Sequence, residues 1–214
     1  MRTMNLPAVA ALLLLLPQAA LAAPTERSAH EQPLVRKPNV VNGERLFATC
    51  AACHGQNAGG VQDGSVPAIA GQHWQVLSKL LLDFRYFRRW DNRMVNVAAG
   101  YHLRGPQEIA DVVAYVSSLP PQPASGLGTG EHVARGAQMY ARLCSACHGI
   151  QAQGDGPAGY PRLAGQQYGY LVRQLQDAAA SRRPTFSRQH ILLLKTLDIV
   201  DIQGMSDHLA RLNP

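Results

Sequence analysis

Two segments of this 214-residue chain combine cysteines and a histidine at a fixed spacing. Each has two cysteines separated by two residues, with a histidine directly after the second: Cys50, Cys53 and His54, then Cys144, Cys147 and His148. In a CxxCH segment the two thiols can bond covalently to the vinyl groups of a porphyrin, and the histidine can ligate its iron. The spacing therefore predicts covalent attachment of haem c at both segments.

Cysteine pairs have two other common uses, and neither suits this chain. A thioredoxin-like dithiol needs a βαβ setting, but no segment has the alternating pattern of a strand. A zinc site would have to bring both pairs together, although 94 residues and a proline-rich segment separate them. We therefore expect two covalently bound haem c groups.

The two CxxCH segments belong to a longer repeat. An offset of 94 residues relates Cys50 to Cys144 and carries Pro67 onto Pro161. The same offset aligns IAGQ at 69–72 with LAGQ at 163–166. Self-similarity over this length indicates duplication of a whole domain. The expected organisation is a signal peptide, an N-terminal extension, a first domain, a Pro/Gly-rich linker and a second domain: residues 1–22, 23–39, 40–119, 120–131 and 132–214.

The first 22 residues have the features of an export signal. Arg2 is followed by an apolar run at 8–16 and by Ala-Leu-Ala at 20–22, as expected for signal cleavage. The alternative is a retained membrane anchor, but this run is far shorter than the about 20 residues that span a bilayer. We expect cleavage near Ala22 and a periplasmic protein.

Apolar residues recur at helical spacing, so both halves are expected to be all-α. One apolar stripe, at 109, 112, 113 and 116, follows Pro106 at a first helical position. The last helix is expected to start at Asp198, a good N-cap. Helices are expected at 41–50, 72–89 and from 105 in the first half, and at 134–144, 166–181 and from 198 in the second.

The order helix, CxxCHG, Pro-x-x-AGQ, helix, Met and amphipathic helix resembles class I cytochrome c. The duplicated form resembles the dihaem cytochrome c4 family, over residues 40–119 and 132–213. The resemblance implies two tandem class I cytochrome c domains joined by the linker. In that family the proline after the motif offers its carbonyl oxygen to the haem-ligating histidine, and Pro67 and Pro161 match it. Such a contact would orient the histidine. The alternative interpretation is that each proline only forms a turn.

The sixth iron ligand of the first half is expected to be Met94. It follows His54 by 40 residues and is the only methionine between His54 and the linker. This matches where the family places its axial methionine, although a core methionine is the alternative. A thioether ligand raises the reduction potential of the iron.

The second half departs from the family here. The offset of 94 takes Met94 to Arg188, and counting back from the last helix takes it to Ser187. The nearest residue able to ligate iron is His190. We therefore expect His148 and His190 to ligate the second iron, which would have a lower reduction potential because it lacks the thioether ligand. Electrons would then pass from the second haem to the first. Two alternatives stay open: a five-coordinate iron, and a solvated His190 with another group on the iron.

The chain is basic, with 20 Lys+Arg against 14 Asp+Glu and a formal net charge of +6. Arginines gather before Met94 and in the equivalent region of the second half: Arg85, Arg88, Arg89, Arg93, Arg182, Arg183 and Arg188. We expect some to pair with haem propionates. The others would either form a basic rim for an acidic partner or be ordinary solvated residues. Export and the modest charge argue against nucleic acid as a partner.

Together these features favour an electron carrier over an enzyme, since no acid/base pair or nucleophile stands out. It would carry electrons between a respiratory donor and a terminal oxidase or reductase, in loose association with membrane complexes. One alternative is a cytochrome subunit of a periplasmic dehydrogenase. The other is a haem enzyme acting at an open second iron; a thiosulfate dehydrogenase of the dihaem type would need a further cysteine ligand, and all four cysteines are in CxxCH segments.

Overall fold

The computed structural model describes residues 37–214. The predicted signal peptide, 1–22, and most of the predicted extension, 23–39, lie outside the described residues. Within 37–214, no helix combines the length and the apolar character needed to cross a membrane.

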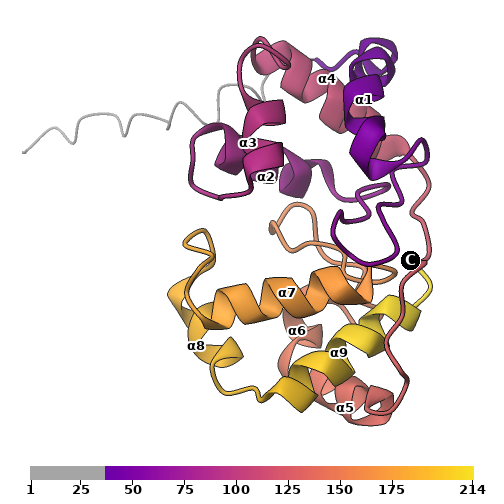
Figure 1. The fold of residues 1–214 in the computed structure, drawn as a ribbon, viewed down its shortest axis with the longest axis vertical. Helices are drawn as coiled ribbons and strands as arrows, with labels where there is room; N and C mark the ends of the chain where they lie inside the picture. The colour runs from indigo at the N-terminus through magenta and orange to yellow at the C-terminus, as the bar shows by residue number, and fades with distance from the viewer. Residues whose placement is uncertain (1–36) are drawn as a thin grey trace, which may run out of the picture.

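The described chain forms two groups of helices, one above the other in Figure 1. The first group is α1 (Val40–His54), α2 (Trp74–Arg85), α3 (Asn92–Ala98) and α4 (Pro106–Ser118). The second is α5 (Val133–Leu143), α6 (Ser145–His148), α7 (Tyr168–Ala179), α8 (Arg188–Leu194) and α9 (Ile199–Arg211). The only β-type pairing in the described residues is an isolated bridge between Asp155 and Tyr160. The all-α prediction is confirmed.

In each group the first helix packs against the last, α1 on α4 and α5 on α9. Glycines allow the close crossing: a Cβ on Gly43 would lie 2.1 Å from the Asp111 carbonyl oxygen, and one on Gly136 would lie 2.0 Å from Gly204. The predicted start signals hold, because Pro106 opens α4 and Asp198 caps α9. Each group therefore has its own helical frame.

Each group also has its own buried core. The first contains buried residues from α1, α2 and α4 and from the loops between them: Phe47, Ala51, Ala58, Ala70, Leu77, Leu82, Leu103, Ile109, Val112, Val113 and Val116. The second is smaller: Tyr140, Ala152, Ala164, Leu171 and Leu209. Separate cores are what two independently packed domains require.

Several helix bounds differ from the sequence expectation. The helices expected at 72–89 and 166–181 begin two residues later and end earlier than expected, as α2 and α7. They end early because Phe87 and Ser181, which follow them, adopt φ of 56° and 60°, a conformation that ends a helix. The sequence reading also missed α3 and α8, two seven-residue helices that contain Met94 and His190.

The two groups are joined by a reciprocal pair of glutamines from the repeated AGQ sequences. The Gln72 side chain accepts from the Arg162 backbone N–H at 2.9 Å and donates to its carbonyl oxygen at 2.9 Å. The Gln166 side chain does the same with the backbone of Ala68, at 3.0 and 2.8 Å. Because Ala68 and Arg162 are also 94 residues apart, the interface repeats the symmetry of the sequence.

The segment between the two groups, residues 119–132, runs along one side of the molecule (Figure 1). The backbone N–H groups of its glycines donate hydrogen bonds to buried side chains of the second group. The Gly126 N–H donates to Gln167 Oε1 at 2.8 Å, and the N–H groups of Gly128 and Gly130 donate to the two carboxylate oxygens of Asp207 at 2.9 and 2.7 Å. These bonds hold this segment against the second group.

Candidate haem-binding sites

The cysteines of each CxxCH segment lie at the end of the first helix of their group. Cys50 and Cys53 are in the last turns of α1, whereas Cys144 stands between α5 and α6. All four thiols are free of disulfides; Cys53 and Cys147 are exposed. Burial raises the pKa of Cys50 and of Cys144 to about 11. Burial therefore keeps the Cys50 and Cys144 thiols protonated at neutral pH.

The histidine of each segment is buried and held by a proline thirteen residues later. His54 Nδ1 lies 2.9 Å from the Pro67 carbonyl oxygen, and His148 Nδ1 lies 3.0 Å from that of Pro161. A carbonyl oxygen only accepts, so each Nδ1 carries the proton and each Nε2 keeps its lone pair. Burial lowers the pKa of both histidines, which favours the neutral imidazole that a metal needs.

Glycine makes this contact possible in both groups. Gly60 and Gly154 have φ of 76° and 74°, and a Cβ on either would come within 2.6 Å of the backbone around Pro67 or Pro161. The loop can therefore approach the proline carbonyl closely only with glycine at these positions.

Met94 and His190 occupy the same position on short helices of equal length. Asp91 caps α3 and accepts from the Met94 backbone N–H at 3.2 Å. Ser187 caps α8 and accepts from the His190 backbone N–H, also at 3.2 Å. The offset between the halves is therefore 96 at this point, which pairs Met94 with His190 rather than with Arg188 or Ser187.

In the second group the centroids of the His148 and His190 rings lie 6.3 Å apart, with the ring planes at 44°. Imidazole nitrogens bind first-row metal ions at about 2.0 Å. A ring nitrogen lies about 1.15 Å from the centroid of a five-membered ring with bonds of about 1.35 Å. Two imidazoles on opposite sides of one ion would thus have centroids about 6.3 Å apart. The observed centroid spacing equals this value.

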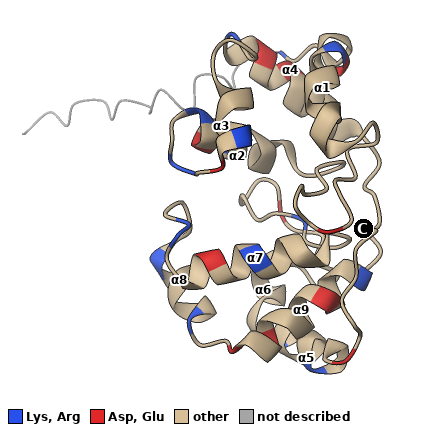
Figure 2. Ribbon diagram, in the orientation of Figure 1, with Lys and Arg blue, Asp and Glu red and all other residues tan. Residues whose placement is uncertain are grey.

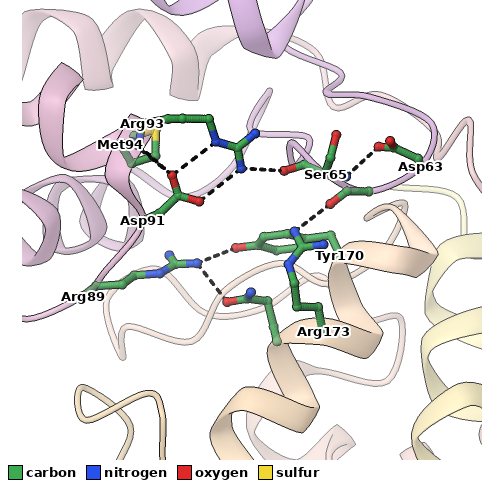
Figure 3. Close-up of polar contacts among 10 residues, drawn as sticks. Asp63, Ser65, Arg89, Asp91, Arg93, Met94, Tyr170 and Arg173 are labelled. Carbon is green, nitrogen blue, oxygen red and sulfur yellow. Dashed lines mark hydrogen bonds and ion pairs between the residues drawn. The ribbon is translucent and has the colours of Figure 1, made fainter.

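In the first group the start of α3 is held by hydrogen bonds of Asp91 and Arg93. Figure 3 shows Asp91 accepting from Arg93 and from the Met94 backbone, while Arg93 donates to the Ser65 carbonyl oxygen at 3.2 Å. The positive charge of Arg93 is close enough to His54 to contribute, after burial, to the lowering of its pKa.

The arginines that the sequence grouped together have separate roles. Arg89 reaches across to the second group and donates to the Tyr170 hydroxyl at 2.9 Å and to Gln174 at 2.8 Å (Figure 3). Arg88 pairs with the buried Asp83 at 3.0 Å. Figure 2 shows the basic residues interspersed with acidic ones on the helices.

The sequence analysis did not predict a role for Phe186 near the second site, and it named Arg183 only as one of a group of arginines. The Phe186 ring stacks on His190, with centroids 4.9 Å apart and planes at 20°, and the Arg183 guanidinium carbon lies 4.4 Å from the Phe186 centroid. An aromatic residue directly before an N-cap was the available signal, because a large apolar residue there often packs on the first turn of the helix.

Two all-α groups, each with a CxxCH histidine held by a proline carbonyl, define a tandem c-type cytochrome. The family model described as Cytochrome c matches residues 40–120 and 133–191, and the chain belongs to that family. Its relatives identify it as a dihaem cytochrome of the c4 type, which carries two covalently attached haem c groups.

Cytochrome c4 of Azotobacter vinelandii is 26% identical over 185 residues, which cover 80% of this chain and 88% of the relative. Reduced recombinant cytochrome c4 from Pseudomonas stutzeri has the same fold, with a TM-score of 0.74 and 24% identity, over 83% of this chain and all of that one. A Stutzerimonas stutzeri protein named thiosulfate dehydrogenase electron acceptor is 30% identical over 173 residues, which cover 75% of this chain and 77% of the relative.

Proposed function

We propose that this electron-transfer cytochrome works in the periplasm, carrying electrons between a respiratory donor and a terminal oxidase or reductase. The observation that carries the proposal is the duplicated site: two buried histidines, each oriented through Nδ1 by a proline carbonyl. A bound haem supplies a one-electron couple at each site. The chain's own residues set where each couple sits and at what potential.

The proposed anchors are Cys50 and Cys53 in the first domain and Cys144 and Cys147 in the second, each pair forming two thioether bonds. His54 and His148 would ligate the irons through Nε2, since Nδ1 faces the proline. Pro67 and Pro161 would keep each ring in one tautomer and one orientation, which raises its basicity towards the metal.

The sixth ligands are proposed to be Met94 in the first domain and His190 in the second. Their matching positions after Asp91 and Ser187 support the pairing. The 6.3 Å separation of the His148 and His190 rings supports a bis-histidine centre. Because a thioether ligand raises the potential and a second imidazole does not, the second haem is expected to be the electron entry point and the first the exit.

A second candidate function is that of an electron acceptor for a periplasmic dehydrogenase. The relative named thiosulfate dehydrogenase electron acceptor favours this role. An oxidase is an equally concrete downstream partner, because a Bradyrhizobium relative named cbb3-type cytochrome c oxidase subunit FixP is 31% identical over 186 residues, although this chain covers only 61% of its length. In both roles the protein itself performs no chemistry on a substrate.

Spectroelectrochemical titration of the purified dihaem protein, with electron paramagnetic resonance of the oxidised form, tests this scheme. Two separate potentials are expected, together with two low-spin ferric signals. In His190→Ala the second signal should become high-spin, and the reduced protein should bind carbon monoxide at one haem. A low-spin second haem that persists in His190→Ala would refute the ligand assignment, and rapid carbon monoxide binding by the parent protein would favour an open iron.

The location is tested separately by mass spectrometry of the protein secreted to the periplasm. The expected N-terminus is Ala23, with two haem c masses added to the mature chain. A retained Met1 in the haem-loaded protein would overturn the proposed export and cleavage.

A further inference from the structure

In the second domain the side chains of Phe186 and Arg183 stack in a column next to the His190 ring. The turn that precedes α8 is closed by the Phe186 backbone N–H, which donates to the Arg183 carbonyl oxygen at 3.2 Å. This turn places both side chains on the same side as His190. Phe186 is nearly parallel to the His190 ring, at 20° and 4.9 Å, and the Arg183 guanidinium carbon lies 4.4 Å from the Phe186 centroid.

Among the arginines of residues 37–214, Arg183 is unusual because it is buried, with 8% of its surface exposed. Its only side-chain hydrogen-bond partner in the described residues is the neutral Gln174, and no carboxylate there lies within ion-pair distance. Burial, and then the nearby Arg89, lower the pKa of Arg183 to about 10, so it stays cationic at neutral pH. Tyr170, Asp177 and Asp83 oppose this lowering by smaller amounts, and a buried cation with no direct ion pair acts on nearby charge more strongly than one in water.

The first domain shows that the fold does not require this column. Trp90 stands directly before the N-cap of α3, as Phe186 does before that of α8. Trp90 is 69% exposed, and its ring contacts Phe87, 5.9 Å away between centroids. The aromatic residue at this position is therefore turned onto the helix only in the domain that has histidine in place of methionine.

We propose that Phe186 and Arg183 are positioning residues for the second haem centre: Phe186 fixes the plane of the His190 imidazole, and Arg183 raises the reduction potential of the iron. The inference rests on the proposed ligation by His190. A flat ring stacked on the imidazole opposes its rotation about the bond to the metal. The nearby cation disfavours the oxidised iron, which carries one more positive charge than the reduced iron. The column would thus offset part of the potential lost with the missing thioether.

The test compares variants of the dihaem protein at Phe186, Arg183 and Arg182, with His190→Ala as the test of ligation. Phe186→Leu removes the ring but keeps an apolar side chain, and Phe186→Tyr keeps the ring. Arg183→Gln removes the buried charge, and its matched control is Arg182→Gln, because Arg182 is 63% exposed and pairs with Asp177 at 2.7 Å. The signals of the first haem report the folding of the first domain, and circular dichroism, which follows both domains, reports the folding of the second in every variant.

Phe186→Leu should change the g-values of the second low-spin ferric signal, whereas Phe186→Tyr should leave them as in the parent. Arg183→Gln should shift the electron partition between the haems about tenfold towards an oxidised second haem, equivalent to about 59 mV for one electron. Arg182→Gln should shift it much less. If Arg183→Gln disturbs folding, Arg183→Lys provides the second measurement, with a potential close to that of the parent.

Three results would overturn the proposal: an unchanged signal in Phe186→Leu, equal shifts in the two Arg→Gln variants, or a potential in Arg183→Lys well below that of the parent. His190→Ala separates this failure from failure of the proposed function. If His190→Ala becomes high-spin while the other variants match the parent, the ligation stands and only the positioning role is refuted. If His190→Ala stays low-spin, the ligation itself fails.

Discussion

Loss of the reciprocal glutamines should weaken the coupling between the two domains by a predictable amount. Each side chain makes two hydrogen bonds to the backbone of the opposite domain, at 2.8–3.0 Å. A hydrogen bond contributes about 0.5–1.5 kcal/mol net, so Gln72→Ala and Gln166→Ala should each cost about 1–3 kcal/mol. The symmetry of the two sets predicts similar losses for the two variants.

The cost should fall on the domain that unfolds first, because bonds across an interface are lost as soon as one domain opens. The smaller buried core of the second domain makes it the weaker partner. With a slope of about 2 kcal/mol per M in guanidinium chloride, its midpoint should fall by about 0.5–1.5 M. The midpoint of the first domain should stay where it is.

The chain contains its own reporter for this assay. Both tryptophans, Trp74 and Trp90, lie in the first domain, so fluorescence follows that domain alone. Circular dichroism at 222 nm follows both domains, and the two curves should separate in the variants. Gln176→Ala is the matched control, because Gln176 is exposed on α7. If Gln72→Ala and Gln166→Ala move the transitions no more than this control does, the interface bonds contribute nothing net and the reasoning is wrong.

Three further predictions concern stability within the domains, each measured by the same unfolding curves. Gly136→Ala should destabilise the second domain by about 3 kcal/mol or more, because the new methyl would lie 2.0 Å from Gly204; Gly105→Ala, which has open space around it, should change little. Asp83→Asn should cost the first domain about 2–3 kcal/mol, since this buried carboxylate pairs with a lysine at 2.5 Å and an arginine at 3.0 Å, and an unchanged fluorescence midpoint would contradict it. Tyr140→Phe should remove an alkaline loss of stability. Burial raises the pKa of Tyr140 to about 12 from an ordinary value of 10.0, so the parent protein loses the stability contributed by the neutral phenol as the pH rises from 10 to 12. A variant whose stability falls with pH as steeply as that of the parent would refute this prediction.

The sequence was a good guide wherever the signal is local. The CxxCH spacing, the start of α4 at Pro106 and the cap of α9 at Asp198 depend on residues within one or two turns. The duplication made it possible to predict two all-α parts, since each motif could be compared with its copy in the other half. The short helices α3 and α8 were missed because seven residues carry too little periodicity to be recognised.

The position of His190 shows why a constant offset between the copies was not enough. Between α2 and α3 the chain has six residues, but between α7 and α8 it has eight. After α3 and α8 the difference is reversed, with seven residues against four. Because the two changes nearly cancel over the whole segment, counting from either side misses the helix between them. Only the caps, Asp91 and Ser187, restore the register.

By itself the sequence determined the kind of cofactor, the duplication and the helical class, because covalent haem attachment and helix formation depend on residues that are close together in the chain. The tertiary structure decided which residues meet: Gln72 with Arg162, 90 residues away, and His190 with His148 and Phe186. These contacts depend on how loops of different length fold back onto the two packed cores. Loop length and chain reversal have long-range consequences that no local pattern contains.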